Sequence, residues 1–208
     1  MTGSGSADRV WSRPISCIVT AVAAEDAVLA SLDEVERVLR SLRGVWDEEA
    51  VDELDHALQA AGHAAARAPG DDELLVAALL HDVAHSPLVT EAGQPEHDAV
   101  ARVWLTPRFG PRVGWLAGSH VVAKRHLAAA DPEYAAALSG TSVTSLGVQG
   151  GAGEAGPEWT ANPWWPAALE LRRCDDAAKD PAAPVPELGW ALAAVRRVAE
   201  RQDPEYPT

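Results

Sequence analysis

The feature that most constrains this chain is an apolar run that ends in a histidine–aspartate pair, LLVAALLHDVAH, from Leu74 to His85. A carboxylate buried beside an imidazole costs several kcal/mol unless its charge is compensated. A metal ion is the simplest compensation. On a regular helix the side chains of His81 and Asp82 diverge by about 100°, so both can reach a metal only near a helix end or a distortion. The run therefore predicts a buried helix that ends at a metal site.

The rest of the chain is dominated by apolar residues that recur three and four positions apart, the spacing of amphipathic helices. Gly, Pro and acidic residues mark the breaks and caps between them. The sequence predicts helices over residues 24–44, 49–66, 72–84, 95–105, 111–126, 131–139, 166–178 and 186–202. No segment convincingly predicts a strand, and the Gly-rich residues 147–159 are expected to form a surface loop or lid. The predicted fold class is all-α, with one domain over residues 24–208 and a flexible or extended segment at 1–23.

Charge and cysteine content restrict the partners and the compartment. The formal net charge of −14 argues against a nucleic acid or an anionic membrane as partner and favours a small substrate. Cys17 and Cys174 belong to no CxxC pair, so neither a disulfide scaffold nor a thiolate zinc site is indicated, and reduced cytoplasm fits best. Residues 15–24, ISCIVTAVAA, resemble part of a signal peptide, but the linker-like start MTGSGSADR favours a simple N-terminal extension.

Several histidines could converge on the predicted metal site. Five of the seven precede or occupy predicted helices: His56, His81, His85, His97 and His120. Asp175 and Asp176 supply a late carboxylate on an otherwise apolar helix. Imidazole and carboxylate without thiolate suit iron, manganese or zinc. A single His–Asp pair is more simply interpreted as two exposed polar residues on a surface helix, and only the other ligand candidates argue against this interpretation.

The ordered pattern H…HD…H…H…D resembles the HD-domain superfamily, and specifically its dinuclear members. The segments LDHALQAA, AALLHDVAH, SHVVAKRHL, DPEYAAALS, SVTSLGVQGG and LRRCDDAAK resemble, in this order, the mixed-valence di-iron oxygenases that cleave phosphonates (PhnZ-type) and, more distantly, myo-inositol oxygenase. The resemblance spans residues 46–179. It implies an HD-domain helical bundle with a metal site in its core, and six ligands: His56, His81, Asp82 as the bridge, His97, His120 and Asp175. Asp175 is preferred to Asp176 because the family ligand lies four residues before the lysine that is Lys179 here.

An anionic substrate is also indicated by the residues themselves. Residues 100–130 contain Arg102, Arg108, Arg112, Lys124 and Arg125 and no acid, in a chain that is acidic overall. A solvated helix face explains the first three. Lys124, however, lies one turn after His120, and Arg172 lies three residues before Asp175. Together they could hold a phosphonate through charge-assisted bonds. The resemblance adds Ser142 and Ser145, from the motif SxxSL, and Lys179 to the expected substrate-binding residues.

The resemblance also implies a reaction. Two iron ions, Fe(II) and Fe(III), would use O₂ as co-substrate to cleave the carbon–phosphorus bond of a small 1-hydroxyphosphonate, such as 2-amino-1-hydroxyethylphosphonate, into phosphate and a carboxylic acid. His85 and Lys124 are the expected catalytic residues. His85 would manage protons, and its plainer role is a hydrogen bond to a ligand.

One departure from the family lies upstream of His56. The family has a Tyr ten residues before its first ligand and a Glu seven before it, and here these positions hold Trp46 and Glu49. Glu49 would pair with a substrate ammonium group. Trp46 offers no phenol, and either shapes the pocket or packs in the core. Two alternatives stay open: a dinuclear HD phosphohydrolase acting on a nucleotide or phosphomonoester, and a metal-binding protein without activity. The sequence does not decide between monomer and dimer.

Overall fold

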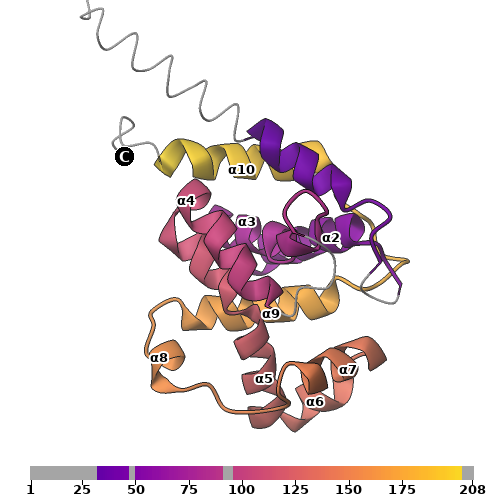
Figure 1. Ribbon diagram of the computed structural model, residues 1–208, viewed down its shortest axis with the longest axis vertical. Helices are drawn as coiled ribbons and strands as arrows, with labels where there is room; N and C mark the ends of the chain where they lie inside the picture. Colours follow the sequence, from indigo (N-terminus) through magenta and orange to yellow (C-terminus); the bar gives the residue numbers. More distant parts are fainter. Residues whose placement is uncertain (1–31, 47–49, 91–95, 203–208) are drawn as a thin grey trace, which may run out of the picture.

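The computed structural model describes residues 32–46, 50–90 and 96–202, and all of its regular elements are helical (Figure 1). The predicted all-α class is confirmed for this part of the chain. Residues 32–41 form a helix, and the following helices are α2 (Glu53–Arg67), α3 (Asp72–Leu80), the short 3₁₀ helix η1 (Val83–His85), α4 (His97–Gly118), α5 (His120–Ala130), α6 (Pro132–Ala137), α7 (Gly140–Val148), α8 (Pro157–Thr160), α9 (Trp165–Ala177) and α10 (Leu188–Gln202).

Helix α3 is the centre of the bundle. Its residues from Leu74 to Leu80 are all buried, as expected of a helix that is apolar around its whole circumference. Helices α2, α4, α9 and α10 pack around it. Residues 32–41 lie beside α10 at one end of the molecule, whereas α5, α6, α7 and α8 gather at the other end (Figure 1). The metal-site candidates therefore come from the central helix and its immediate neighbours.

The predicted helix over 72–84 is shorter in the structure and ends where the ligands begin. Asp71 caps α3 by accepting from the Leu74 N–H at 3.0 Å, and the helix stops at Leu80. Asp82 has φ −102° and ψ 24°, outside helical geometry, and η1 follows directly. This is the helix-end distortion that lets adjacent His81 and Asp82 face one centre.

The predicted break between the helices over 95–105 and 111–126 is present, but a second break within the latter helix was not predicted. Helix α4 folds back on itself at Gly110, whose φ of 85° is readily adopted only by glycine, and it ends with Ser119 as its C-cap. Gly114 and Gly118 let the two halves touch, because a Cβ at either position would lie within 3 Å of Thr106 or Arg102. The break at Ser119 makes His120 the first residue of α5.

A substitution in this close approach is expected to destabilise the protein. A Cβ at Gly114 would lie 2.1 Å from Thr106 Oγ1 and 3.0 Å from its Cα. We expect Gly114→Ala to lower the free energy of unfolding by about 1–3 kcal/mol, the usual cost of overpacking. Urea unfolding measures it. Gly147→Ala is the matched control, because nothing lies within 4 Å of that position. A Gly114→Ala protein as stable as this control would contradict the packing of the two halves.

Two further predictions need correction. Helix α7 was not predicted, and α8 adds one helical turn inside the segment 147–159 that was expected to be a loop. Helix α6 has no buried residue, and α7 has only Ser142. The predicted segment at 1–23 and Cys17 lie outside the described residues, and the single domain stays a prediction. No helix among the described residues is long and apolar enough to cross a membrane.

Candidate metal centre

The six expected ligands meet at one place in the bundle. His81 caps the end of α3, and His97 and His120 are the first residues of α4 and α5. His56 lies in α2, and Asp175 is near the end of α9. Two groups of donor atoms have the spacing of a metal site, with all atoms of a group within 4.8 Å of one another: His56, His81 and Asp82 in one, and Asp82, His97 and His120 in the other.

The carboxylate of Asp82 is shared between the two groups. Its Oδ2 lies 3.5 Å from His56 Nε2 and 3.1 Å from His81 Nε2. Its Oδ1 lies 3.7 Å from His97 Nε2 and 3.6 Å from His120 Nε2. One oxygen facing each group is the arrangement that a bridge between two metals requires.

Asp175 joins the first group, and Asp176 does not. Asp175 Oδ1 lies 3.6 Å from His56 Nε2, and its Oδ2 lies 3.4 Å from His81 Nε2. Asp176 instead accepts from Arg172 and from the Tyr134 hydroxyl. The structure thus places at the cluster the aspartate that the sequence analysis preferred.

Three of the imidazoles are oriented by backbone carbonyls. The Nδ1 atoms of His56, His81 and His120 lie 3.0, 2.8 and 2.6 Å from the carbonyls of Ala178, Ala78 and Ala117. An Nδ1–H that donates to a carbonyl leaves the Nε2 lone pair for a metal, and such outer contacts commonly orient histidine ligands.

A cation fits the space between these donors. Nε2 of His56 lies 3.4 Å from Nε2 of His81, and Nε2 of His97 lies 2.9 Å from Nε2 of His120. Two lone pairs at such distances need a proton or a metal between them. Asp82 Oδ1 is buried and has no hydrogen-bond partner. An orphaned buried carboxylate oxygen is costly unless an ion compensates it.

The electrostatics show that the cluster attracts positive charge. Burial opposes ionisation of Asp82, but the charge of His81 outweighs it and holds the pKa of Asp82 well below its usual range. Burial likewise opposes ionisation of Asp175, and the charge of Arg172 holds its pKa well below the usual range. Burial lowers the pKa of His120 to about 3, against the opposing charge of Asp82. Burial also lowers the pKa of His56 and of His81, but the two aspartates outweigh it and raise both pKa values, so a metal that binds these two histidines has to displace protons.

Two lysine–serine pairs adjoin the cluster. Lys124 Nζ donates to Ser145 Oγ at 2.6 Å, and Lys179 Nζ donates to Ser142 Oγ at 3.0 Å. Lys179 Nζ also lies 3.8 Å from Asp175 Oδ1, which joins the pocket to the first ligand group. Burial, followed by the charge of Arg172, lowers the pKa of Lys124 to about 8. Four of the predicted substrate-binding residues thus form two Lys–Ser pairs beside the ligands; below, we call them the Lys–Ser pocket.

Arg172 lies behind this pocket. Its Nη1 donates to Asp175 Oδ2 at 2.6 Å, and its Nε donates to Asp176 Oδ2 at 2.9 Å, while Nη2 donates to Asp176 Oδ1. Arg108 and Arg112, in contrast, pair with Glu34 and Asp71. These two arginines were expected on a solvated helix face; instead they form partly buried ion pairs away from the cluster.

The remaining candidates lie at the edge of the cluster or outside the described residues. His85 Nε2 is 4.0 Å from Asp82 Oδ1, and its ring centroid is 5.3 Å from that of His97. Trp46 is 64% exposed, which rules out the alternative of core packing. Glu49 lies outside the described residues, so its expected role stays a prediction.

Two residues at the site were missed by the sequence analysis. Glu53 is 1% exposed, its Oε2 has no hydrogen-bond partner, and burial followed by the charge of Asp82 raises its pKa to about 7. Its place one turn before His56, on the same helix face, is the signal that could have identified it. Tyr134, on α6, reaches Asp176 and Arg172. No feature of the segment DPEYAAALS marks this tyrosine.

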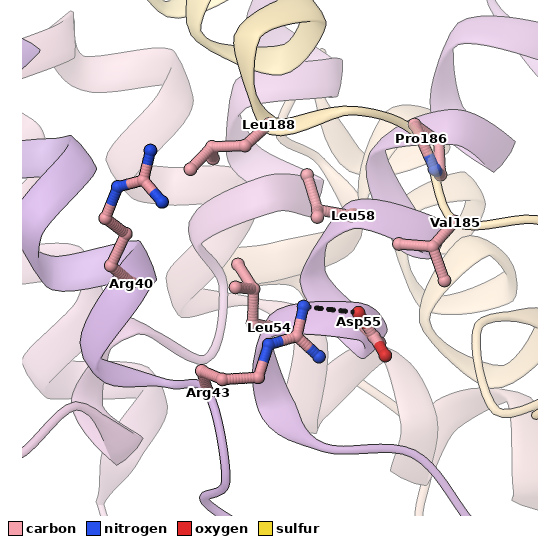
Figure 2. A pocket seen from close by; sticks show the side chains of 8 residues that line it. All are labelled: Arg40, Arg43, Leu54, Asp55, Leu58, Val185, Pro186 and Leu188. Carbon is pink, nitrogen blue, oxygen red and sulfur yellow. Dashed lines mark ion pairs between the residues drawn. The ribbon is translucent and has the colours of Figure 1, made fainter.

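A groove elsewhere on the molecule lacks the features of a metal or anion site. It has a volume of about 560 Å³ and lies between α2 and the segment before α10 (Figure 2). Arg43 pairs there with Asp52 and Asp55, and Arg40 pairs with Glu36. Its lining contains no histidine, and its cations are neutralised. The metal centre and the Lys–Ser pocket are therefore the better candidate site.

Comparison with known proteins identifies the family. No family model matches the chain. The hydroxymethylphosphonate dioxygenase of Gimesia maris is 37% identical over 151 residues, which cover 68% of this chain and 74% of that protein. The 1-hydroxy-2-(trimethylamino)ethylphosphonate dioxygenase (glycine-betaine-forming) of Leisingera caerulea is 30% identical over 140 residues, covering 62% and 70%. The chain belongs to the family of the phosphonate dioxygenases.

Proposed function

We propose that this dioxygenase uses two iron ions and O₂ to cleave the carbon–phosphorus bond of a small 1-hydroxyphosphonate, releasing phosphate and a carboxylic acid. The proposal rests on the shared carboxylate of Asp82, which has one oxygen toward each group of ligands and the Lys–Ser pocket alongside. Membership in a family of dioxygenases favours this reaction over the alternative of a phosphohydrolase, which needs no O₂.

The ligands divide into two metal positions. His56, His81, Asp82 and Asp175 would hold one iron, and Asp82, His97 and His120 would hold the other. Imidazole and carboxylate donors without thiolate suit iron, and a pair of irons supplies the one-electron and O₂ chemistry that no side chain can provide.

The substrate's phosphonate is proposed to bind in the Lys–Ser pocket. Lys124 and Lys179 supply positive charge, and Ser142 and Ser145 supply hydroxyl groups that already point at the lysines. A guanidinium has five N–H donors, and Arg172 engages one at each of its three nitrogens, which leaves two for phosphonate oxygens. Binding there places the C1 hydroxyl beside the ligands, because Lys179 lies 3.8 Å from Asp175.

His85 is proposed to carry protons between the centre and solvent. The overall reaction of a 1-hydroxyphosphonate dianion with O₂ yields a carboxylate, HPO₄²⁻ and one proton, so a proton must leave the site. The side chain of His85 is 21% exposed, and its Nε2 lies 4.0 Å from Asp82 Oδ1. It therefore reaches from the bridging carboxylate toward solvent.

The test of the function combines metal analysis with turnover. Protein purified anaerobically is expected to hold two irons per chain, to consume O₂ with hydroxymethylphosphonate or 2-amino-1-hydroxyethylphosphonate, and to release phosphate. These two compounds differ only in the substituent on C1, so their rates also decide whether the chain prefers an amino group. Turnover of phosphomonoesters without O₂ uptake would replace the proposal with the phosphohydrolase. Cytoplasmic location and oligomeric state stay predictions.

The activity is expected to fall on the alkaline side. Lys124 has a lowered pKa of about 8, and only its charged form attracts the phosphonate. Since its charge is present below this pKa and lost above it, kcat/KM should decline as the pH rises through about 8. Bound metal ions add positive charge nearby and would move the decline to lower pH. Lys124→Arg, which stays charged throughout this range, should lack the decline. An identical profile in both proteins would contradict the assignment.

A further inference from the structure

Arg172 is held on two sides, on one by groups that are not metal-ligand candidates and on the other by Asp175, which is one. Its Nε and Nη2 grip both oxygens of Asp176, and the Tyr134 hydroxyl donates to Asp176 Oδ2 at 2.6 Å. Nε of Arg172 also lies 3.2 Å from this hydroxyl oxygen. On its other side, Nη1 binds Asp175. The guanidinium is thus fixed within its plane by two carboxylates and one phenol.

The contacts leave part of the guanidinium for a ligand. Asp176 occupies the edge formed by Nε and Nη2, and Asp175 takes one donor of Nη1. The two donors that engage no described acceptor are one N–H on each of Nη1 and Nη2, and guanidinium donors of this kind bind the oxygens of a tetrahedral anion.

The orientation of the Arg172 guanidinium has to be maintained against repulsion from the two nearby lysines. The charge of Arg172 lowers the pKa of Lys124, as does that of Lys179, so three cations lie within electrostatic range of one another. Arg172 is 3% exposed, and a long side chain loses considerable rotamer freedom when it is held in one conformation. Asp176 supplies the compensating charge, and Tyr134 fixes the Asp176 carboxylate.

Tyr134 is suited to this task by its place on α6. Asp131 caps the helix by accepting from the N–H groups of Glu133 and Tyr134, both at 3.0 Å. Helix α6 packs against α5, but none of its residues is fully buried, so the hydrogen bond of Tyr134 adds to that contact. Burial raises the pKa of Tyr134 above its usual value, so its hydroxyl stays a donor. The hydrogen bond to Asp176 therefore fastens α6 to the site.

We propose that Tyr134 and Asp176 are positioning residues that set the affinity for phosphonate through the guanidinium of Arg172. The inference rests on the proposed function, in that the Lys–Ser pocket and Arg172 bind the phosphonate. Neither residue touches the metals, so both act on substrate binding and leave the metal content unchanged.

Tyr134→Phe tests the proposal without changing any charge. Methylphosphonate is the probe, because it lacks the hydroxyl group at C1, and its binding to the iron-loaded protein under anaerobic conditions is measured by calorimetry. We expect its Kd to rise about 3- to 10-fold, the range of one lost hydrogen bond. With substrate, KM should rise by a similar factor while kcat stays within about twofold, as expected for a loss of binding alone. The control is Glu133→Gln, an exposed neighbour on the same helix, which should leave Kd unchanged.

Asp176→Asn distinguishes the effect of Asp176 on the orientation of Arg172 from the effect of its negative charge. Removal of a negative charge next to three cations would by itself tighten binding of an anion, whereas loss of the grip on Arg172 weakens it. We expect weaker binding, by about 10-fold or more, with iron content equal to that of the wild type. Tighter binding would overturn the proposal, as would an unchanged Kd in both variants. Failure of the wild type to bind methylphosphonate would instead overturn the proposed function of the pocket, and the positioning role with it.

Discussion

Asp82→Ala is expected to give a folded protein that holds neither of the two proposed irons. Among the described residues, Asp82 is the one whose carboxylate faces both groups of histidines, at 3.1 Å from His81 Nε2 and 3.6 Å from His120 Nε2. Loss of a bridge removes a ligand from both metal positions at once. Since the redox chemistry depends on the metals, O₂ uptake and phosphate release should fall by about 10³-fold or more, as expected when several kcal/mol of metal catalysis are lost.

Metal analysis with two comparison variants makes this result specific. His56→Ala removes a ligand of one position only and should leave about one iron per chain. His63→Ala is the control, because His63 lies on the same helix but its Nε2 contacts the Ala177 carbonyl at 3.1 Å. It should retain both irons. Full iron content in Asp82→Ala, or equal iron content in His56→Ala and His63→Ala, would show that the ligand set is wrong.

The convergence of the six candidate ligands could be predicted because it depends on residue types that are rare in buried helices. The apolar run before His81 forces the His–Asp pair toward the core, and the later histidines and Asp175 follow in the order of a known pattern. The geometry of the cluster depends on features that periodicity does not report. The turn at Asp82 and the break at Ser119 each follow an apolar stretch that could have continued as helix.

The parts that escaped prediction are those that depend on tertiary contacts. Helix α7 is built from GTSVTSLGV, whose Gly, Thr, Ser and Val have low helix propensity. It forms with Ser139 as its cap and is held by the hydrogen bonds of its serines to Lys124 and Lys179. Glu53 was missed because the acids around it are typical of a solvated helix start. Its carboxyl is nevertheless buried in the folded protein, which the pattern of apolar residues does not report.

Lys124→Met is expected to weaken phosphonate binding more than any other single change in the pocket. Lys124 is 3% exposed, and the hydroxyl of Ser145 is its hydrogen-bond partner. No carboxylate among the described residues pairs with it within 4.0 Å, so its charge is available to an anion. A charge-assisted hydrogen bond contributes about 1.5–3 kcal/mol, so KM for a 1-hydroxyphosphonate should rise about 10- to 150-fold. Methionine keeps the length and apolar stem of the side chain, which limits the effect on folding.

The control for net charge is Arg196→Met. Arg196 is exposed on α10, and its replacement changes the formal charge by the same amount without touching the pocket. Two measurements are made: KM by steady-state kinetics, and the Kd of methylphosphonate under anaerobic conditions. Both constants should rise strongly in Lys124→Met and stay unchanged in Arg196→Met, with two irons in both proteins. Loss of iron in Lys124→Met would mean that the lysine supports the metal centre instead. An unchanged KM would place the phosphonate elsewhere, because a buried ammonium group beside the anion cannot be removed without a measurable cost.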